Sequence, residues 1–363
     1  MIIGIDISRA NTTQRTGVEN YVFYLVTELT KIIPHHVRVI LYTREPLIDD
    51  LKFLEKICEV KVLKWKPKFF WTQIRLSYEM IVHRPDILFI PGHVVPIIHP
   101  KNTIMTVHDV AAYRFPNVYS FFERMYSILS AQYAVNHLAK VIVPSEFTKQ
   151  ELLSLVNQQQ SQNIVVVHNG FDCDKKIVIN KTNIKQITKP YLLYVGRKET
   201  KKNIVRLVEA FNRVKATHDI QLVLVGKEGY GYDEIKKKIS TSLFKHDIIE
   251  TGYVTDQQLS TLYINAKAFM FVSLYEGFGF PVLEAMQHDC AVICSDKTSL
   301  PEITQDAALL VDAKNVTDIV HSIKKILTDQ KVKDQLIKKG KKQITLFSWN
   351  DTANNIWKIL QSL

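Results

Sequence analysis

Two glutamates, Glu276 and Glu284, flank a glycine-containing segment in the stretch LYEGFGFPVLEAM. Gly277 and Gly279 allow backbone amides to point at one ligand, and Pro281 predicts the first turn of a helix, whose N-terminus favours a phosphate. Carboxylates accept hydrogen bonds from vicinal hydroxyl groups, as on a ribose or a hexose. The stretch therefore indicates a site for a phosphorylated sugar. Taken alone, each glutamate also fits a structural role, since an acid near a helix start adds about 0.3–1 kcal/mol of stability.

A second group of candidate residues lies in YVGRKETKKNI. Arg197 directly follows a predicted strand, and Lys202 lies five residues further on, just before a predicted helix. Arginine grips two oxygens at once and lysine acts as a point charge, so the pair suits a diphosphate. Gly196 permits close approach of the backbone to a ligand. The alternative is an ordinary basic turn, in which Lys198, Lys201 and Lys202 all face water.

The elements that must position these residues alternate along the chain. Short apolar runs are separated by amphipathic segments, which predicts parallel sheets with helices on both faces. The first half contains IIGIDI, RVILYT, VKVL, DILFI, TIMTV, KVIVP and IVVVH, and the second contains PYLLYVG, QLVLVG, DIIETGYV, AFMFV, CAVICS and AALLV. Residues 173–189 are polar and without clear periodicity, so we expect a linker there. Two doubly wound α/β domains follow, with the site in the cleft between them, at the carboxyl ends of the strands.

The composition limits the possible classes of protein. The chain has 363 residues, and its 46% hydrophobic and 23% charged residues are typical of a globular protein with two domains. No apolar run reaches the roughly 20 residues of a membrane helix, and the N-terminus shows no signal-peptide pattern, so we expect a cytoplasmic location. The four cysteines have no zinc-binding spacing and are expected to be reduced and structural. The net charge of +11 predicts an anionic partner: nucleic acid, a nucleotide or an anionic membrane surface.

Together, the motifs resemble those of a known family. The spacing of Glu276 and Glu284 is similar to the acid-x7-acid motif of retaining glycosyltransferases with the GT-B fold, in the large group called family 4. Gly196 and Arg197, with Lys202, resemble that family's diphosphate-binding residues. In the first half, TGVENYVFYLV is similar to the family's glycine loop and TVHDVAAYRFP to its His-Asp segment, while VPSEFTKQEL and VVHNGFD are also typical. The resemblance covers nearly the whole chain.

The resemblance implies an architecture. In a GT-B fold, two Rossmann-like doubly wound parallel-sheet domains face a cleft. Residues 1–175 would form the N-terminal, acceptor-side domain, and residues 185–346 the C-terminal domain that binds the nucleotide sugar. Residues 347–363 would form a helix that crosses back to the N-terminal domain.

The resemblance also implies catalytic roles. Arg197 and Lys202 would neutralise the leaving diphosphate of a sugar nucleotide, and Glu276 would contact the transferred sugar. His108 would lie near the sugar and the acceptor. Without the resemblance, a single histidine after a strand indicates no more than a polar loop residue, and its neighbour Asp109 fits a helix cap or an ion pair equally well.

Further residues would bind the donor. Glu284 would hold the ribose hydroxyls, and Gly17 would approach the diphosphate from the N-terminal domain. Backbone amides in the glycine-containing segment would meet the sugar and the phosphate, and the TGYV loop would border the base. The complete donor-binding set comprises Gly17, Gly196, Tyr253, Val254, Gly277, Phe278, Gly279, Phe280 and Glu284.

The expected reaction follows from these charges. Breaking the bond between a sugar and a diphosphate places negative charge on the leaving group, and fixed cations stabilise that charge. We see no convincing DxD loop at the end of a predicted strand, so we expect an enzyme that needs neither a metal nor another cofactor. The family implies retention of the anomeric configuration, with attack from the face that the diphosphate leaves.

The donor and acceptor are indicated less sharply. WTQIRLSYEMIVHRPDILFIPGHVVP and HDVAAYRFP look most similar to bacterial mannosyltransferases, which implies mannose transfer from GDP-mannose in cell-surface polysaccharide synthesis. UDP-glucose and UDP-N-acetylglucosamine remain alternative donors. The acceptor would be a glycan or a lipid-linked sugar.

A basic and aromatic segment, KVLKWKPKFFWTQIR at residues 61–75, admits three interpretations. It could dock on the anionic inner face of a membrane, where lipid-linked acceptors reside. Its aromatic residues could instead belong to the core, with the lysines as a solvated rim. The same mixture suits single-stranded nucleic acid, but no nucleic-acid-binding signature accompanies it, and we expect no such partner.

Two other functions are alternatives to the sugar transferase. A GT-B-shaped nucleotide-sugar epimerase would need acids and histidines arranged to move protons, and the combination of Arg197, Lys202 and two glutamates argues against it. A basic nucleic-acid-binding module would bind with an affinity that falls steeply with salt, and it would not bind sugar nucleotides.

Overall fold

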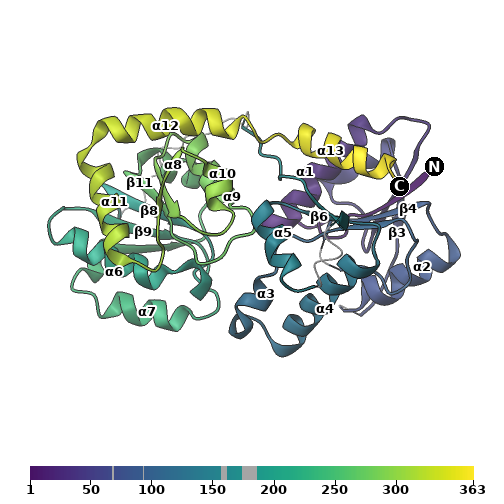
Figure 1. Cartoon of the computed structure of the whole chain (residues 1–363), viewed down its shortest axis with the longest axis horizontal. Coiled ribbons are helices and arrows are strands. Elements are labelled where there is room, and N and C mark those ends of the chain that lie inside the picture. The colour runs from purple at the N-terminus through teal and green to yellow at the C-terminus, as the bar shows by residue number, and fades with distance from the viewer. Residues whose placement is uncertain (68, 93, 157–161, 174–185) are drawn as a thin grey trace. The chain divides into compact units, whose positions relative to one another are not determined.

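The computed structural model describes residues 1–67, 69–92, 94–156, 162–173 and 186–363. It separates the chain into two compact units (Figure 1): Met1–Gly170 with Phe347–Leu363, and Phe171–Leu346. The linker expected at residues 173–189 falls largely outside the described residues. None of the described helices is both long enough and apolar enough to cross a membrane.

The N-terminal unit is built on a parallel sheet with the strand order β3-β2-β1-β4-β5-β6-β7. Its strands are β1 (Ile2–Asp6), β2 (Arg38–Thr43), β3 (Glu59–Val62), β4 (Ile87–Ile90), β5 (Thr103–Thr106), β6 (Lys140–Val143) and β7 (Ile164–Val166). The central strands β1, β4 and β5 are almost entirely buried. A strand covered on both faces needs apolar side chains on both, which explains the continuous apolar runs in the sequence.

Helices cover both faces of this sheet. They are α1 (Gly17–Ile32), η1 (Asp49–Lys56), η2 (Trp71–Leu76), α2 (Ser77–Val82), α3 (Ala111–Arg114), η3 (Pro116–Val118), α4 (Phe121–His137), α5 (Glu146–Leu153) and α13 (Trp349–Gln361). In Figure 1, α1 and α13 lie above the sheet, and α2, α3 and α4 lie below it. The ring of Trp349, the first residue of α13, stacks on Tyr24 of α1 at 5.4 Å. The last helix of the chain therefore belongs to the N-terminal unit.

The C-terminal unit repeats this plan, with the strand order β10-β9-β8-β11-β12-β13. Its strands are β8 (Tyr191–Val195), β9 (Gln221–Val225), β10 (Ile248–Gly252), β11 (Ala268–Phe271), β12 (Val292–Ser295) and β13 (Ala308–Val311). Its helices are η5 (Thr200–Lys202), α6 (Ile204–Lys215), α7 (Tyr232–Ser240), η6 (Lys245–Asp247), α8 (Asp256–Asn265), α9 (Phe280–Gln287), α10 (Leu300–Thr304), α11 (Val316–Thr328) and α12 (Gln330–Ile344). Each apolar run expected to be a strand is a strand, in either unit.

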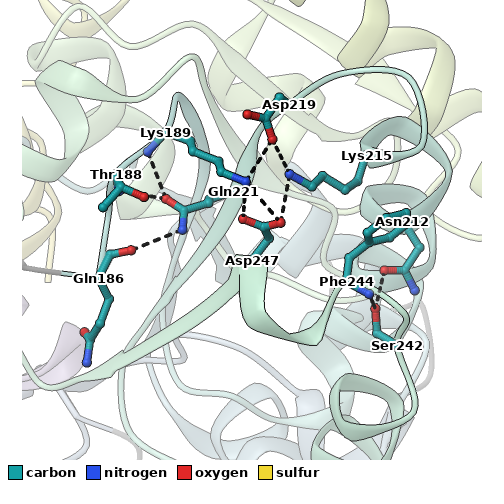
Figure 2. A network of polar contacts seen from close by, with 10 residues as sticks. All are labelled: Gln186, Thr188, Lys189, Asn212, Lys215, Asp219, Gln221, Ser242, Phe244 and Asp247. Atoms are coloured by element: carbon teal, nitrogen blue, oxygen red, sulfur yellow. Dashed lines mark hydrogen bonds and ion pairs between the residues drawn. The ribbon is translucent and has the colours of Figure 1, made fainter.

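A network of charges holds the amino end of the second sheet (Figure 2). Nζ of Lys189, just before β8, lies 2.9 Å from Asp219 and 3.1 Å from Asp247. Nζ of Lys215, at the end of α6, lies 2.6 Å and 2.8 Å from the same two carboxylates. The side chain of Gln221 accepts a hydrogen bond from the backbone N–H of Lys189. These contacts tie together the segments that enter β8, β9 and β10.

Candidate active site

The topology brings the two motifs of the second unit to one edge of its sheet. β8 pairs with β9 on one side and with β11 on the other, so the direction of the strand order reverses between β8 and β11. In open parallel sheets, ligands bind at such a reversal, outside the carboxyl ends of the strands. The loop after β8 carries Arg197 and Lys202, and the loop after β11 carries Glu276.

Lys202 and Glu276 form an ion pair in this loop region. Nζ of Lys202 donates to Oε1 of Glu276 at 2.6 Å, and only 14% and 12% of the two side chains are exposed. Nζ also lies 5.3 Å from the centre of the Phe271 ring. A shielded pair interacts more strongly than a surface pair, because less water screens the charges. Two of the predicted catalytic residues therefore meet, and Glu276 partly neutralises Lys202.

Arg197 differs from the lysines that follow it. Lys198 is buried, and its Nζ lies 2.5 Å from Glu250 on β10. Lys201 is mostly buried and lies 3.5 Å from Glu199. The alternative of an ordinary basic turn with its lysines facing water is therefore wrong. Arg197 is exposed, and among the described residues it forms no ion pair. Its guanidinium is the charge that this loop presents to solvent.

Asn203 joins the loops after β8 and β11. Its buried side-chain amide donates to the carbonyl oxygens of Val272, at 3.0 Å, and Ala313, at 2.7 Å. It adopts a left-handed conformation with φ of 59°, which asparagine tolerates better than most residues. The backbone N–H of Leu274 donates to the carbonyl of Lys201 at 2.8 Å, which adds a direct link between the loops. Lys202 and Glu276 are thus held on two loops that are bonded together.

Ser299 fixes the backbone between the two glutamates. Its buried hydroxyl lies 3.0 Å from the carbonyl oxygen of Glu276 and 2.8 Å from that of Phe278, and shares its one proton between them. In a trans peptide the C=O and N–H point in opposite directions, so the N–H groups of the two following glycines point away from Ser299. Gly279 has a φ of 110°, and a Cβ there would lie 2.6 Å from a methyl carbon of Leu300. The backbone conformation therefore favours glycine at this position, and a Cβ would also require the Leu300 side chain to shift.

Glu284 lies one turn inside α9, which begins at Phe280 with Pro281 in its first turn, as expected. Oε2 of Glu284 accepts a hydrogen bond from the hydroxyl of Tyr263 at 3.0 Å. Tyr263 is fully buried; burial and then the charge of Glu284 hold the pKa of Tyr263 well above its usual range. The tyrosine hydroxyl therefore keeps its proton and orients the carboxylate. The ring of His288 stacks on Tyr263 at 5.3 Å and completes this support.

The predicted base-bordering residues follow β10. This strand ends at the same edge of the sheet as β8. The loop after it exposes Tyr253 but buries Val254. Tyr253 is 75% exposed, and Nζ of Lys227 lies 5.7 Å from the centre of its ring. Val254 is buried. An exposed aromatic ring can stack on a flat ligand, whereas Val254 contributes to the core.

His108 lies in the N-terminal unit, directly after β5 and Val107. Its Nε2 lies 2.9 Å from the carbonyl oxygen of Pro91, which follows β4. A carbonyl can only accept, so Nε2 donates and carries a proton. The ring meets Tyr21 of α1 edge-on, with centroids 4.6 Å apart. Oδ1 of Asp109 accepts from the backbone N–H of Ala111, so this acid forms a local turn before α3, whose N-cap residue is Val110.

Gly17 is the first residue of α1 and is exposed. Thr16 precedes it and forms a capping box with Glu19. A Cβ at Gly17 would meet no heavy atom of the described chain within 4 Å, apart from its immediate surroundings in sequence and helix. Packing within the described chain therefore does not require a glycine at this position.

No three histidine, cysteine, aspartate or glutamate side chains within the described ranges cluster so that they could hold a metal ion. The four cysteines all lie within the described residues and form no disulfide, and Cys290 and Cys294 are buried. Burial raises the pKa of both buried thiols to about 12, so they stay protonated and unreactive at neutral pH.

The basic and aromatic segment is divided between core and surface. Trp71 is buried, and its ring N–H donates to a backbone carbonyl. Lys61 is paired with a buried glutamate. Phe69 and Phe70 are 66% and 56% exposed, so the interpretation that all the aromatic residues belong to the core is wrong. Lys68 lies outside the described residues.

Comparison with known protein families identifies the family of this chain. The model for glycosyl transferases group 1 matches residues 175–343, and the model for glycosyltransferase family 4 matches residues 15–175. The chain belongs to this family of glycosyltransferases. The resemblance of the motifs is therefore confirmed, and a glycosyltransferase activity follows from it.

Individual relatives agree with this assignment. O-antigen chain mannosyltransferase B of Escherichia coli is 27% identical over 273 residues, which cover 72% of this chain and 71% of that protein. O-antigen chain mannosyltransferase RfbU of Salmonella typhimurium is 25% identical over 282 residues, covering 75% and 72%. Among solved structures, a sucrose-phosphate synthase from Thermosynechococcus elongatus matches with a TM-score of 0.75 and 18% identity, over 99% of this chain and 98% of that chain. The glycosyltransferase has the GT-B fold, with two Rossmann-like units, as predicted.

Sequence reasoning missed the residues that support the site. Asn203, Tyr263 and Ser299 are polar, buried and bonded to the loops or side chains that carry the candidate residues. Asn203 and Ser299 occupy the N-cap positions of α6 and α10, where asparagine and serine are common. From the sequence alone, each residue therefore indicates only the start of a helix. Their bonds to other loops depend on the tertiary fold.

Proposed function

We propose that this glycosyltransferase transfers mannose from GDP-mannose to a glycan or lipid-linked acceptor. The transfer retains the anomeric configuration and requires no metal. It takes place in the cytoplasm and contributes to the synthesis of a polysaccharide for the cell surface. The observation that carries the proposal is the ion pair of Lys202 with Glu276 at the strand reversal of the second sheet, next to the loop that carries the exposed Arg197. The names of the two O-antigen mannosyltransferases support the choice of sugar and pathway class.

The cations act on the leaving diphosphate. The exposed guanidinium of Arg197 binds two phosphate oxygens at once. Lys202 keeps one N–H on Glu276 and has two more, which can reach phosphate oxygens. As the sugar bond breaks, the negative charge grows on these oxygens, and fixed positive groups stabilise it more than they stabilise the ground state. Such electrostatic stabilisation amounts to about 3–4 kcal/mol for one strong donor.

The glycine-containing loop and α9 complete the donor site. In this proposal, backbone N–H groups of the loop that Ser299 holds bind the sugar and the phosphate, and the start of α9 adds its partial positive charge. Glu284, oriented by Tyr263, accepts hydrogen bonds from the ribose hydroxyls. The exposed ring of Tyr253 covers the base.

The N-terminal unit contributes the acceptor side. Gly17, exposed at the start of α1, approaches the diphosphate from this unit in the proposed complex. His108, held by Pro91 and Tyr21, offers a fixed imidazole to the sugar and the incoming hydroxyl. UDP-glucose and UDP-N-acetylglucosamine remain alternative donors, since the base contacts proposed here do not discriminate between bases.

A thermal-shift comparison of GDP, UDP and ADP and their sugars tests the donor. A ligand at 100 times its dissociation constant adds about 2.7 kcal/mol of stability, so the preferred nucleotide should raise the melting temperature clearly. GDP-mannose is expected to give the largest shift. A larger shift with a UDP sugar would contradict the choice of donor.

Substitution of the cations tests the catalytic assignment. Arg197→Ala should lower kcat/KM by roughly a hundredfold or more while leaving the unfolding free energy nearly unchanged, because the side chain is exposed and unpaired within the described structure. Lys236→Ala, on an exposed lysine of α7, is the matched control.

Activity that is lost with a chelator and restored by manganese would contradict the metal-free mechanism.

A further inference from the structure

Helix α4 has apolar side chains on two sides. Its buried residues are small: Ala131, Ala134 and Val135. Its exposed apolar residues are large and begin at its first turn: Phe121, Phe122, Met125, Tyr126 and Leu129. Their spacing places them on one side of the helix, opposite the buried side. Phe122 is 78% exposed. The larger apolar side of α4 is therefore turned to solvent.

A second apolar stripe runs along η2 and α2. Ile74, Tyr78 and Ile81 recur at helical spacing and are 50–61% exposed. The adjacent residues on the other side of α2, Ser77 and Met80, are buried. The stripe continues the exposed pair of phenylalanines that precedes η2. Two neighbouring helices thus expose one row of large apolar residues each.

Contacts join the two stripes into one surface. The side-chain amide of Gln73 in η2 hydrogen-bonds the hydroxyl of Tyr126 in α4. Nε2 of His99 lies 2.8 Å from the hydroxyl of Tyr133, which ties the loop with the exposed Ile97 to the same helix. The connections from β3 to β4 and from β5 to β6 run in the same direction across the sheet, so right-handed crossovers place α2 and α4 on one face. Figure 1 shows both below the sheet.

The surroundings of this surface are basic. Residues 61–137 contain nine lysines and arginines against four aspartates and glutamates. Three of these cations are paired with acids: Lys61 and Arg75 with the buried Glu79, and Arg114 with Glu151. Lys64 and Lys66 lie just before the exposed phenylalanines and are exposed themselves. Large apolar residues with cations beside them complement an anionic lipid surface. A second copy of this chain would bring like charges together, which opposes association.

We propose that η2, α2, α4 and the loop at residues 97–98 form a docking face for an anionic phospholipid bilayer. The aromatic and aliphatic side chains enter the interface, and the flanking lysines bind lipid phosphates. α4 follows β5, so the docking face begins at the carboxyl edge of the sheet, where His108 lies. A docked enzyme would therefore receive a lipid-linked acceptor beside that histidine, a consequence that rests on the proposed function.

Vesicle co-sedimentation tests the docking face. The full-length protein should sediment with vesicles of equimolar phosphatidylcholine and phosphatidylglycerol, and much less with phosphatidylcholine alone. The double variant Phe121→Ser and Phe122→Ser should lower the partition coefficient by about tenfold or more, since two large apolar side chains no longer leave water. Leu243→Ser is the matched control: Leu243 is 92% exposed in the C-terminal unit, and its loss should change nothing.

A second pair of variants tests the charges. Lys64→Gln with Lys66→Gln should weaken binding to the anionic vesicles, and Lys236→Gln with Lys237→Gln, on the exposed side of α7, should leave it unchanged. Equal binding to neutral and anionic vesicles would contradict the anionic surface. Vesicle binding unaffected by loss of the two phenylalanines, or no binding at all, would overturn the docking face.

Two further measurements separate this proposal from others. Light scattering could show a concentration-dependent dimer that the phenylalanine variant abolishes. That result would overturn the lipid-docking proposal and show that the face binds a second copy of this chain. The thermal shift given by GDP should be the same in the parent and in the phenylalanine variant. Vesicle binding that needs the phenylalanines, in a protein that binds no sugar nucleotide, would overturn the proposed function while the docking face stands.

Discussion

At the scale of single residues, Lys202 and Glu276 form one ion pair. The sequence assigns them separate expected roles, Lys202 at the diphosphate and Glu276 at the transferred sugar. The carboxylate positions the lysine, but it also competes with any phosphate for the same positive charge. An anion that binds here must share Lys202 with Glu276 or displace it. The charge state of Glu276 therefore affects both the stability of the loops and their affinity for a diphosphate.

Replacing Glu276 by glutamine should separate these two effects. Glu276→Gln leaves a largely buried lysine without its charged partner, which should lower the unfolding free energy by about 1.5–3 kcal/mol. The same change removes a negative charge beside Lys202, so GDP without sugar should bind several-fold more tightly. Urea unfolding and isothermal titration measure the two quantities.

Glu199→Gln is the control for net charge, since Glu199 is a largely buried acid of the same region paired with Lys201. It should change GDP affinity much less than Glu276→Gln does. Weaker GDP binding in Glu276→Gln would show that the carboxylate assists the diphosphate rather than competing with it.

At the scale of elements, the amino and carboxyl ends of the second sheet use charge differently. At the carboxyl end, Arg197 is exposed and forms no ion pair among the described residues. At the amino end, Lys189 and Lys215 are held by two carboxylates and bind the strand entrances together (Figure 2). The amino-end network has a structural role, and its contribution to stability should depend on pH.

The direction of that dependence follows from the pKa shifts. Hydrogen bonds from Lys215 and Lys189 lower the pKa of Asp219. For Asp247, burial raises the pKa, but the hydrogen bonds from the same lysines outweigh it and the net pKa is lowered. An acid whose pKa is lower in the folded chain stabilises the fold above its unfolded pKa of about 4, and this contribution is lost as pH falls through the folded pKa.

The double variant Asp219→Asn and Asp247→Asn should therefore be less stable than the parent near neutral pH, with the difference shrinking below about pH 4. Urea unfolding at a series of pH values measures it. Asp233→Asn, on an exposed acid of α7, should show no such dependence. A difference that stays constant down to the acid limit would contradict an electrostatic origin.

The sequence predicts the elements better than their side-chain contacts. Buried parallel strands must be apolar throughout, so each strand is recognisable by itself, and Pro281 and Gly279 locate the start of α9. The pairing of Lys198 with Glu250 depends on which strands become neighbours, and no local pattern encodes it. The positions of Lys202 and Glu276 were predictable from motif spacing, but their direct contact was not.

At the scale of the whole molecule, the last helix completes the first unit. α13 packs on α1, and the hydroxyl of Thr352 donates to the carbonyl of His168 near the end of that unit. A Cβ on Gly170 would overlap the backbone of Trp349, at 2.4 Å, so the two segments need close approach. The N-terminal unit is therefore built from both ends of the chain.

Deleting residues 347–363 should destabilise the N-terminal unit selectively. Its α1 would lose the apolar cover of α13, and the milder change Trp349→Ala should cost about 3–5 kcal/mol, because the indole is buried. Hydrogen exchange should show faster exchange in β1 and α1, with β8 and β11 protected as before. Equal loss of protection in both units would contradict this assignment.

The contribution of both chain ends to one unit sets an order for assembly during synthesis. Phe171–Leu346 is one uninterrupted segment, so translation delivers this unit as a single block. The other unit begins with Met1–Gly170 but stays incomplete until Phe347–Leu363 has also been synthesised. Until then, the surface of α1 that α13 covers is open to chaperones and to other nascent chains.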